Sequence, residues 1–255
     1  MTALPRSFVT TPIAHRAYHD LPAGRPENSL AAVQAAVDAG YGIEIDIQPS
    51  ADGVPMVFHD YDLERLTGTK GPVAGKTAAE LADLGLIGGG PVPTLAQVLD
   101  LVAGQVPLLI EVKDQDGAMG PDVGPLEGAI AETLRGYTGD VALMSFNPHS
   151  VAALADLLPD IPRGLTTCAY APEHWQLLPE ARRAELREIA DFDRVGASFV
   201  SHGHNDLPMP RIAALKAAGV PILCWTIRSP EEEAKAREIA DNITFEAYAA
   251  PLTQG

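Results

Sequence analysis

Residues 43–60 read IEIDIQPSADGVPMVFHD and begin with a strict alternation of apolar and polar side chains. Successive side chains of a strand point to opposite faces, so the three isoleucines would share one face and Glu44 and Asp46 the other. After an Asp-Gly turn the chain returns within a few residues to His59. The stretch predicts a strand with one buried face and two adjacent carboxylates, followed by a short hairpin to a histidine.

Similar β-branched apolar runs recur along the 255 residues, and most precede an Ala-rich helical stretch. Alternating strands and helices over about 250 residues are typical of a closed (β/α)8 TIM barrel. An open doubly wound sheet is the alternative, but no Gly-rich phosphate loop follows the first predicted strand, so we favour the barrel. The predicted strands cover residues 7–15, 42–48, 106–113, 140–146, 161–167, 196–202, 221–227 and 241–246. The predicted helices include 29–40, 94–104, 126–137, 148–158, 209–219 and 229–240.

One section, residues 60–93, breaks this alternation because it is rich in Gly and Pro. We interpret it as a loop-rich insertion after the second strand of a single barrel domain that spans residues 1–255. No low-complexity linker indicates a second domain.

Composition narrows the possible partners. The formal charge of −16 disfavours nucleic acid, and no apolar run approaches the ~20 residues that cross a bilayer. The amino terminus lacks the apolar stretch of a secretory signal, and the two cysteines, Cys168 and Cys224, make a disulfide framework improbable. We therefore expect a cytoplasmic protein with no stable membrane association, whose partner is a small molecule. The sequence assigns no oligomeric state.

Catalytic groups of a barrel lie where strands enter the following loops. Charged and aromatic residues gather at these points. They are His15 and Arg16 after the first strand, Glu44 and Asp46 on the second, His59 after the hairpin, Glu111 and Lys113 on the third, and Trp225 on the seventh.

The carboxylates admit two interpretations. Glu44 and Asp46 would repel each other unless a cation lay between them, and Glu111 from the next strand would complete an oxygen-rich site for Mg²⁺ or Ca²⁺. Alternatively, the three acids pair with Arg16 and Lys113 in a structural network of salt bridges. Both basic residues have donors that suit phosphate oxygens, and the two roles are compatible.

The histidines also admit two interpretations. A lone histidine after a strand is more often structural, but His15 and His59 at one barrel mouth, beside a metal site, favour general acid and base catalysis. His202 and His204 are weaker candidates for the same mouth. The remaining histidines, His19, His149 and His174, are interpreted as surface residues.

The order of these motifs resembles the glycerophosphodiester phosphodiesterase family, and the likeness covers most of the chain. It begins with a His-Arg pair, a Pro-Glu-Asn segment, a Glu-x-Asp strand, an Asp-Gly turn and a His-Asp pair. It continues with VPTLAQVLDLVAGQVPLLIEVK, Ser145-Phe146 and AAGVPILCWTI.

The resemblance implies a (β/α)8 barrel with an excursion after the second strand, as in small cytoplasmic members. It implies a metal-dependent enzyme that hydrolyses glycerophosphodiesters to glycerol 3-phosphate and an alcohol. His15 and His59 match the catalytic pair; Glu44, Asp46 and Glu111 match ligands of Mg²⁺ or Ca²⁺; Arg16, Lys113, Glu27 and Trp225 match residues around the phosphate and substrate.

Three departures from the family pattern bear on the substrate. Ala17 stands where the family usually has Gly, residues 17–25 form a longer segment, and the last strand lacks a common Thr-Asp. One alternative is a related phosphodiesterase acting on lysophospholipid or sphingolipid head groups, which would need an exposed apolar rim. The other is a non-catalytic phosphodiester-binding homologue.

Overall fold

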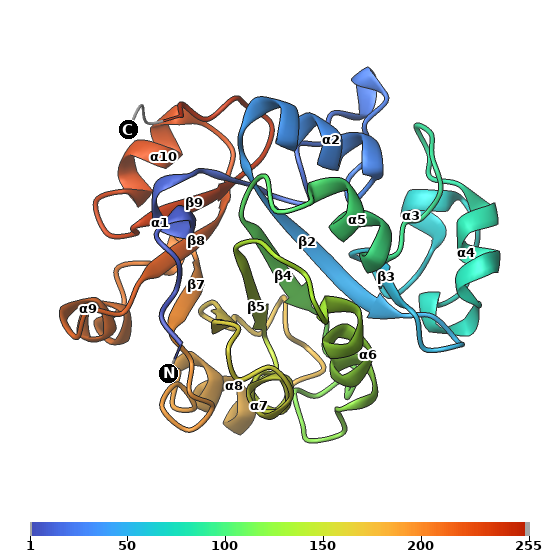
Figure 1. Ribbon diagram of the computed structural model, residues 1–255. Helices are drawn as coiled ribbons and strands as arrows, with labels where there is room; N and C mark the ends of the chain where they lie inside the picture. Colours follow the sequence, from blue (N-terminus) through green and yellow to red (C-terminus); the bar gives the residue numbers. More distant parts are fainter. Residues whose placement is uncertain (1, 253–255) are drawn as a thin grey trace.

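The computed structural model describes residues 2–252, in which eight parallel strands form a closed ring with helices around it (Figure 1). Each strand pairs with the next one along the chain, and β1 pairs with both β2 and β9, which closes the ring. The predicted (β/α)8 barrel is thus confirmed. The ring consists of β1 (Ile13–Ala14), β2 (Gly42–Pro49), β4 (Leu108–Val112), β5 (Val141–Ser145), β6 (Arg163–Thr167), β7 (Phe199–Gly203), β8 (Ile222–Ile227) and β9 (Asn242–Phe245).

Most of the outer helices lie where the sequence predicts them. Ser29 caps the first of them by accepting a hydrogen bond from the Ala32 backbone at 3.1 Å, and Gly40 ends it in the left-handed conformation. Within the described residues no helix is both long and apolar enough to cross a membrane. The helices that follow the prediction are α2 (Leu30–Ala39), α5 (Leu95–Val102), α6 (Pro125–Leu134), α7 (Pro148–Leu157), α9 (Pro210–Ala217) and α10 (Pro230–Ala236), whereas α8 (Glu180–Arg187) was not predicted.

The strands have two buried faces, as expected of a barrel. On β2 the outer face carries Ile43, Ile45 and Ile47, which are fully buried in one large apolar cluster with residues of α2 and α5. Full burial of each isoleucine contributes about 2 kcal/mol to stability. The outer face therefore anchors the strand, which leaves the inner face free to carry polar groups.

The first predicted strand was wrong in its first half. Residues 7–10 form a short helix, α1 (Ser7–Thr10), and only Ile13 and Ala14 pair with other strands. Phe8 of this helix is fully buried in the inner apolar cluster of the barrel, together with Leu109 and Phe199. Burial of the Phe8 ring inside the barrel stabilises the helix by more than the strand propensity of residues 7–10 would stabilise a strand.

A glycine on β6 makes room for this inner cluster. A Cβ atom on Gly164 would lie 2.5 Å from the ring of Phe199, which is too close for any side chain. The barrel interior therefore accepts Phe199 only because its neighbour across the strands is Gly164.

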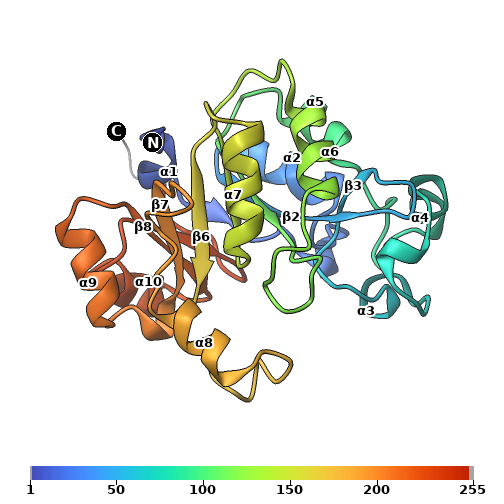
Figure 2. The same ribbon diagram turned by 90° about the horizontal axis from the view of Figure 1, so that it is seen from below.

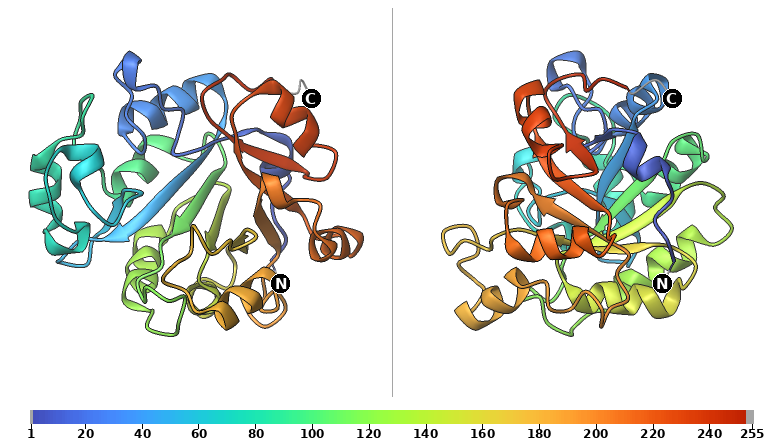
Figure 3. Two further views of the ribbon diagram at one scale, coloured as in Figure 1. Left: turned by 180° about the vertical axis from the view of Figure 1, so that it is seen from behind. Right: turned by 90° about the vertical axis from the view of Figure 1, so that its left-hand side faces the viewer.

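The section after β2 is more ordered than the loop-rich insertion that its composition predicts. A short strand, β3 (Pro55–Val57), runs antiparallel to β2, and two short helices follow, α3 (Glu64–Thr67) and α4 (Ala78–Leu84). They stand at the edge of the ring, as Figure 3 shows from behind. The segment has its own apolar cluster, made by Met56, Phe58, Leu63, Leu66, Val73, Leu81, Leu86 and Val92.

Candidate active site

Three carboxylates meet inside the mouth of the barrel. Glu44 and Asp46 lie on the inner face of β2, and strand register aligns Asp46 with Glu111 of β4. The three side chains are nearly inaccessible to solvent, and one carboxylate oxygen of each lies within 4.8 Å of the others. The spacing inferred from the sequence thus produces one compact acidic cluster.

Two basic residues contact this cluster. The Nζ atom of Lys113 lies 2.7 Å from Asp46 Oδ1 and 2.6 Å from Glu111 Oε1. Arg16 donates its backbone N–H to Glu44 at 2.9 Å, and its Nε lies 3.8 Å from Asp46 Oδ2. The salt-bridge network considered as an alternative is therefore present in the structure.

The three acids differ in how well they are compensated. Burial alone would raise the pKa of Asp46, but the charges of Lys113, His59 and Arg16 outweigh it, and the pKa lies below its ordinary range. Burial, together with the charges of Asp46 and Glu111, raises the pKa of Glu44 well above its ordinary value. At Glu44 the charge of Lys113 and the hydrogen bond from the Arg16 backbone do not outweigh these effects.

This donor set fits a divalent cation. Carboxylate oxygens are the ligands that Mg²⁺ and Ca²⁺ prefer, and three of them are close enough here to share one ion. With the histidines neutral, the charged groups around the mouth also include two more acids than Arg and Lys side chains. The acids are Glu27, Glu44, Asp46, Asp60, Glu111 and Glu246, and the Arg and Lys residues are Arg16, Arg65, Lys113 and Arg228.

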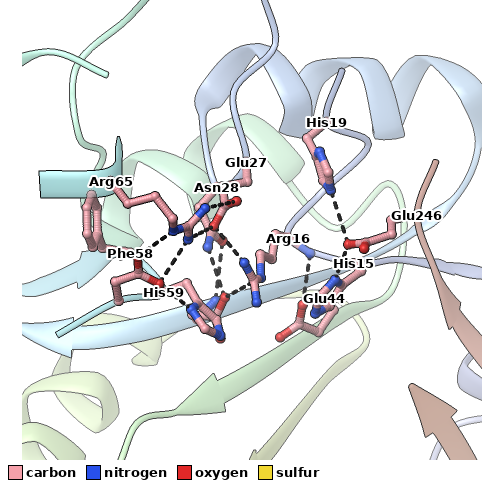
Figure 4. Close-up of polar contacts among 12 residues, drawn as sticks. His15, Arg16, His19, Glu27, Asn28, Glu44, Phe58, His59, Arg65 and Glu246 are labelled. Carbon is pink, nitrogen blue, oxygen red and sulfur yellow. Dashed lines mark hydrogen bonds and ion pairs between the residues drawn. The ribbon is translucent and has the colours of Figure 1, made fainter. Parts of the chain in front are cut away.

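The two histidines line the same cavity as these acids, and each is held by a carboxylate (Figure 4). His15 Nδ1 lies 2.6 Å from Glu246 Oε2, and His59 Nδ1 lies 2.7 Å from Asp60 Oδ1. A carboxylate on Nδ1 sets the orientation of an imidazole and leaves Nε2 for the substrate. Burial lowers the pKa of His15, although the hydrogen bond to Glu246 partly offsets this effect.

Further ion pairs support the two histidines. Behind His59, Asp60 is bound by Arg65, which also binds Glu27 through both of its Nη atoms at 2.8 Å. Glu27 in turn accepts a hydrogen bond from Arg16 Nη1 at 2.8 Å, so one chain of contacts joins His59 to Arg16.

Behind His15, a second set of contacts holds the carboxylate partner. Glu246 Oε1 lies 2.7 Å from Arg228 Nε, and Glu246 Oε2 lies 3.4 Å from His19 Nε2. Burial alone would raise the pKa of Glu246, but its bonds to His15 and His19 and the nearby positive charges lower it well below the ordinary value. Figure 4 shows the two supporting groups on opposite sides of Arg16.

Several of these supporting residues were missed by sequence reasoning. Glu246 ends the last predicted strand, so the rule about strand ends gave a signal for it. Asn28, which donates to Asp46 Oδ2 at 2.9 Å, lies in the Pro-Glu-Asn motif. Arg65 had no such signal, because it lies in the segment that its composition marked as irregular.

The other histidines have different surroundings. His202 is buried on the outer face of β7, where Nδ1 lies 2.7 Å from Thr167 Oγ1, and burial lowers its pKa to about 4. His204 Nδ1 lies 3.3 Å from the Trp225 carbonyl. His19, interpreted from sequence as a surface residue, instead contacts Glu246 with its side chain only 25% exposed.

The cavity between the histidines is small and is lined by charged and polar residues together with Met144, Phe146 and Trp225. Its volume is about 170 Å³, and Trp225 forms part of its wall beside Phe146, with the ring centroids 5.6 Å apart. The indole N–H of Trp225 donates to the Ser201 carbonyl at 3.1 Å, which holds the ring in place. The structure thus brings eight of the nine main sequence-derived candidates together around one space, and the ninth, Glu27, lies behind Arg16 instead.

Comparison with known proteins identifies the family of the chain. The family model described as "Glycerophosphoryl diester phosphodiesterase family" matches residues 15–242. A glycerophosphodiester phosphodiesterase of Caldanaerobacter subterraneus is 27% identical over 218 residues, which cover 81% of this chain and 82% of the relative. A Bacillus subtilis protein with a provisional name for the same activity is 29% identical over 220 residues, which cover 82% of this chain and 84% of the relative.

Solved structures share the fold. A glycerophosphodiester phosphodiesterase of Agrobacterium tumefaciens is 25% identical, with a TM-score of 0.65 and 96% of each chain covered. An Oleispira antarctica phosphodiesterase, solved with its product sn-glycerol-3-phosphate, is 24% identical, with a TM-score of 0.75 and 94% of each chain covered. The barrel and its connections therefore recur in these proteins.

Proposed function

The chain belongs to the glycerophosphoryl diester phosphodiesterase family, and we propose that it hydrolyses glycerophosphodiesters to glycerol 3-phosphate and an alcohol. One observation carries the proposal. A single cavity is lined by two carboxylate-bound histidines, by three clustered acids and by two basic residues suited to phosphate. A purely structural salt-bridge network would not need a histidine on either side of it.

Arg16 and Lys113 would bind the phosphate group. The Nε atom of Arg16 is buried and has no hydrogen-bond partner among the described residues, so it is free to donate to a phosphate oxygen. The charges of Asp46 and Glu111 raise the pKa of Lys113, although burial alone would lower it, so its ammonium stays charged. Glu27 would act indirectly, by orienting Arg16, and Trp225 would wall the substrate site.

Glu44, Asp46 and Glu111 would hold a divalent cation, either Mg²⁺ or Ca²⁺. Bound there, it would supply positive charge beside the non-bridging phosphate oxygens. The raised pKa of Glu44 supports this assignment, because a carboxylate destabilised by its neighbours gains most from a cation.

We assign the two proton transfers to the histidines. Burial lowers the pKa of His15, which keeps its imidazole neutral near pH 7 and suits it to deprotonate the attacking hydroxyl. Glu246 would then stabilise the imidazolium that forms. His59, held by Asp60, would protonate the leaving alkoxide.

The test is to measure glycerol 3-phosphate release from a panel of glycerophosphodiesters after chelation, with Mg²⁺, Ca²⁺ or Mn²⁺ restored one at a time. We expect activity to disappear on chelation and to return with at least one ion. Full activity in the presence of chelator would contradict the cation site. Substrate binding without release of glycerol 3-phosphate would favour the non-catalytic alternative.

A further inference from the structure

A large groove opens from the catalytic cavity. Its volume is about 1010 Å³, and it shares with the catalytic cavity the residues His59, Glu111, Lys113, Phe146 and Trp225. A substituent on a phosphate bound at Arg16 and Lys113 would therefore pass directly into this groove.

The wall of the groove is apolar and aromatic. The ring of Phe146 lies 5.1 Å from that of Trp175 and 5.6 Å from that of Trp225, measured between centroids. Met119 and Leu178 add buried apolar surface, and Leu177 lies at the edge with 88% of its surface exposed. Because the rings pack against each other, they form a continuous aromatic wall along one side of the groove.

The charges within the groove already have partners. Asp60 is bound by His59 and Arg65, and Asp114 accepts hydrogen bonds at 2.8 Å from Asn147 Nδ2 and from the Gly117 backbone. Glu111 and Lys113 bind each other at the catalytic end. The two remaining ionisable side chains, apart from the phenol of Tyr61, are Glu173 and His174, which are exposed. The interior of the groove thus offers little to a charged head group and much to an apolar one.

The groove is held in shape by α8, the helix that sequence did not predict. Arg183 Nη1 donates to the Leu178 carbonyl at 2.6 Å, and Arg182 Nη2 donates to the Met119 carbonyl at 2.7 Å. These bonds fasten two loops from different parts of the chain to one helix, which lies at the lower edge of the molecule in Figure 2. The apolar wall is therefore preformed.

The catalytic cavity is smaller and more highly charged. Besides the catalytic groups it is lined by Thr226, Thr244 and Arg228 and by the apolar Met144 and Phe146, and its volume of about 170 Å³ suits a small polyol such as glycerol. An acyl chain attached to the glycerol would have no space in it.

We propose that the groove binds the alcohol portion of the substrate, and that this portion is apolar: an alkyl or aryl group rather than choline or ethanolamine. This inference rests on the proposed function. In the reaction the phosphorus–oxygen bond to that alcohol breaks, water supplies the new oxygen on phosphorus, and a proton from water passes to the leaving alkoxide.

The experiment compares kcat/KM for sn-glycerol 3-phosphodiesters of ethanolamine, choline, butanol and hexanol. We expect kcat/KM to rise from butyl to hexyl by about fourfold per methylene, as burial of each methylene predicts. The gain should come from KM, since the groove lies away from the reacting bond. Equal values for the hexyl and ethanolamine esters would overturn the inference.

Matched variants locate the effect. Leu177→Ser should lower the ratio of hexyl to ethanolamine kcat/KM, and Trp175→Ala should lower it further. The control is Leu157→Ser on α7, a leucine 45% exposed outside the groove lining, which should leave the ratio unchanged. If Leu177→Ser and Leu157→Ser gave the same ratio of hexyl to ethanolamine kcat/KM, the groove would not be the alcohol site. This comparison can be made even if Trp175→Ala fails to fold.

A further substrate separates the two ends of the site. A lysophospholipid with its acyl chain on the glycerol should be cleaved more slowly than the hexyl ester; faster cleavage would assign the groove to the glycerol side and overturn the proposal.

Release of glycerol 3-phosphate from all diesters at one rate would refute only this inference. No release from any diester would refute the proposed function itself.

Discussion

The mouth of the barrel has two unlike arcs. The first arc, formed by β1, β2 and β4, carries the buried charges, including His15, Glu44 and Lys113. The second arc, formed by β5 to β8, carries mainly apolar and aromatic groups such as Met144, Phe146 and Trp225, with Arg228 at its end beside Glu246. Buried charges need partners within a few ångströms, so they gather on adjacent strands. The comparison suggests that the first arc performs the chemistry and the second selects the substrate.

The largest effect should come from the first arc. His15→Ala should lower kcat about 10³-fold, because a positioned general base contributes on that order. Phe146→Leu in the second arc should change KM instead, by less than about tenfold. Steady-state kinetics on one glycerophosphodiester measures both, with His149→Ala on α7 as the control. A kcat loss for Phe146→Leu as large as that for His15→Ala would break the division between the arcs.

Substitution of Glu246 tests whether β9, which directly precedes it, functions with the first arc. Glu246→Gln should lower kcat/KM by about 10- to 100-fold, as loss of a residue that positions a catalytic group commonly does. The hydrogen bond that His15 donates to Glu246 raises the pKa of His15, so its loss should move the acidic limb of the kcat/KM profile to lower pH. An unchanged limb in the pH profile would limit Glu246 to a structural role.

The second arc should contribute a pH dependence of stability rather than of catalysis. The pKa of His202 is about 4 in the fold, against about 6.5 in the unfolded chain, so unfolding takes up a proton below pH 6.5. Stability is therefore full above pH 6.5 and falls toward pH 4, with about 2 kcal/mol lost between pH 7 and pH 5.

Urea unfolding at the two pH values checks this prediction. The variant His202→Gln should lose less stability between pH 7 and pH 5 than the native chain. Thr167→Val, which removes the hydroxyl next to His202 and keeps the imidazole, is the control and should retain the dependence. If the unfolding free energies of His202→Gln and of the native protein fell equally between pH 7 and pH 5, His202 would not be the titrating group.

The smallest expected effect concerns the backbone of the first arc. Ala17 has a φ of +63°, which costs a residue with a Cβ atom about 1 kcal/mol. Ala17→Gly should relieve that strain, but it also removes one buried methyl, which costs about 0.8 kcal/mol, so the unfolding free energy should change by less than about 0.5 kcal/mol.

Asn28 provides the contrast, since its φ is +58° but its side chain binds Asp46. Asn28→Gly should relieve similar strain and yet destabilise the protein. Thermal unfolding of the two variants distinguishes them, and a loss of stability in Ala17→Gly would show that methyl packing outweighs backbone strain.

Several features followed from local sequence alone. Alternation in residues 43–48 placed the isoleucines outward and Glu44 and Asp46 inward, because side chains of a strand alternate between its faces. The recurring strand and helix pattern indicated a barrel, and the barrel rule for strand ends selected both histidines. The helix predicted at 29–40 also follows from its own cap at Ser29 and its terminating Gly40.

Other features depended on contacts between distant segments. Residues 7–10 became a helix because Phe8 closes the barrel from below, which no local pattern encodes. Arg65 contacts Glu27 across 38 positions of chain, although its contact with Asp60 spans only five. The apolar groove exists because arginines of α8 hold loops that are far apart in sequence.

The amino-acid sequence by itself determined the alternation of strands and helices and the residues that each strand turns toward the barrel interior. Only the tertiary structure decided that Glu246 lies beside His15, because closing the ring pairs β1 with β9 across 231 positions of chain. The physical reason is that the two kinds of feature depend on interactions of different range along the chain. Side-chain periodicity depends on neighbours a few residues away, whereas ring closure and loop packing depend on how much surface the whole chain can bury at once.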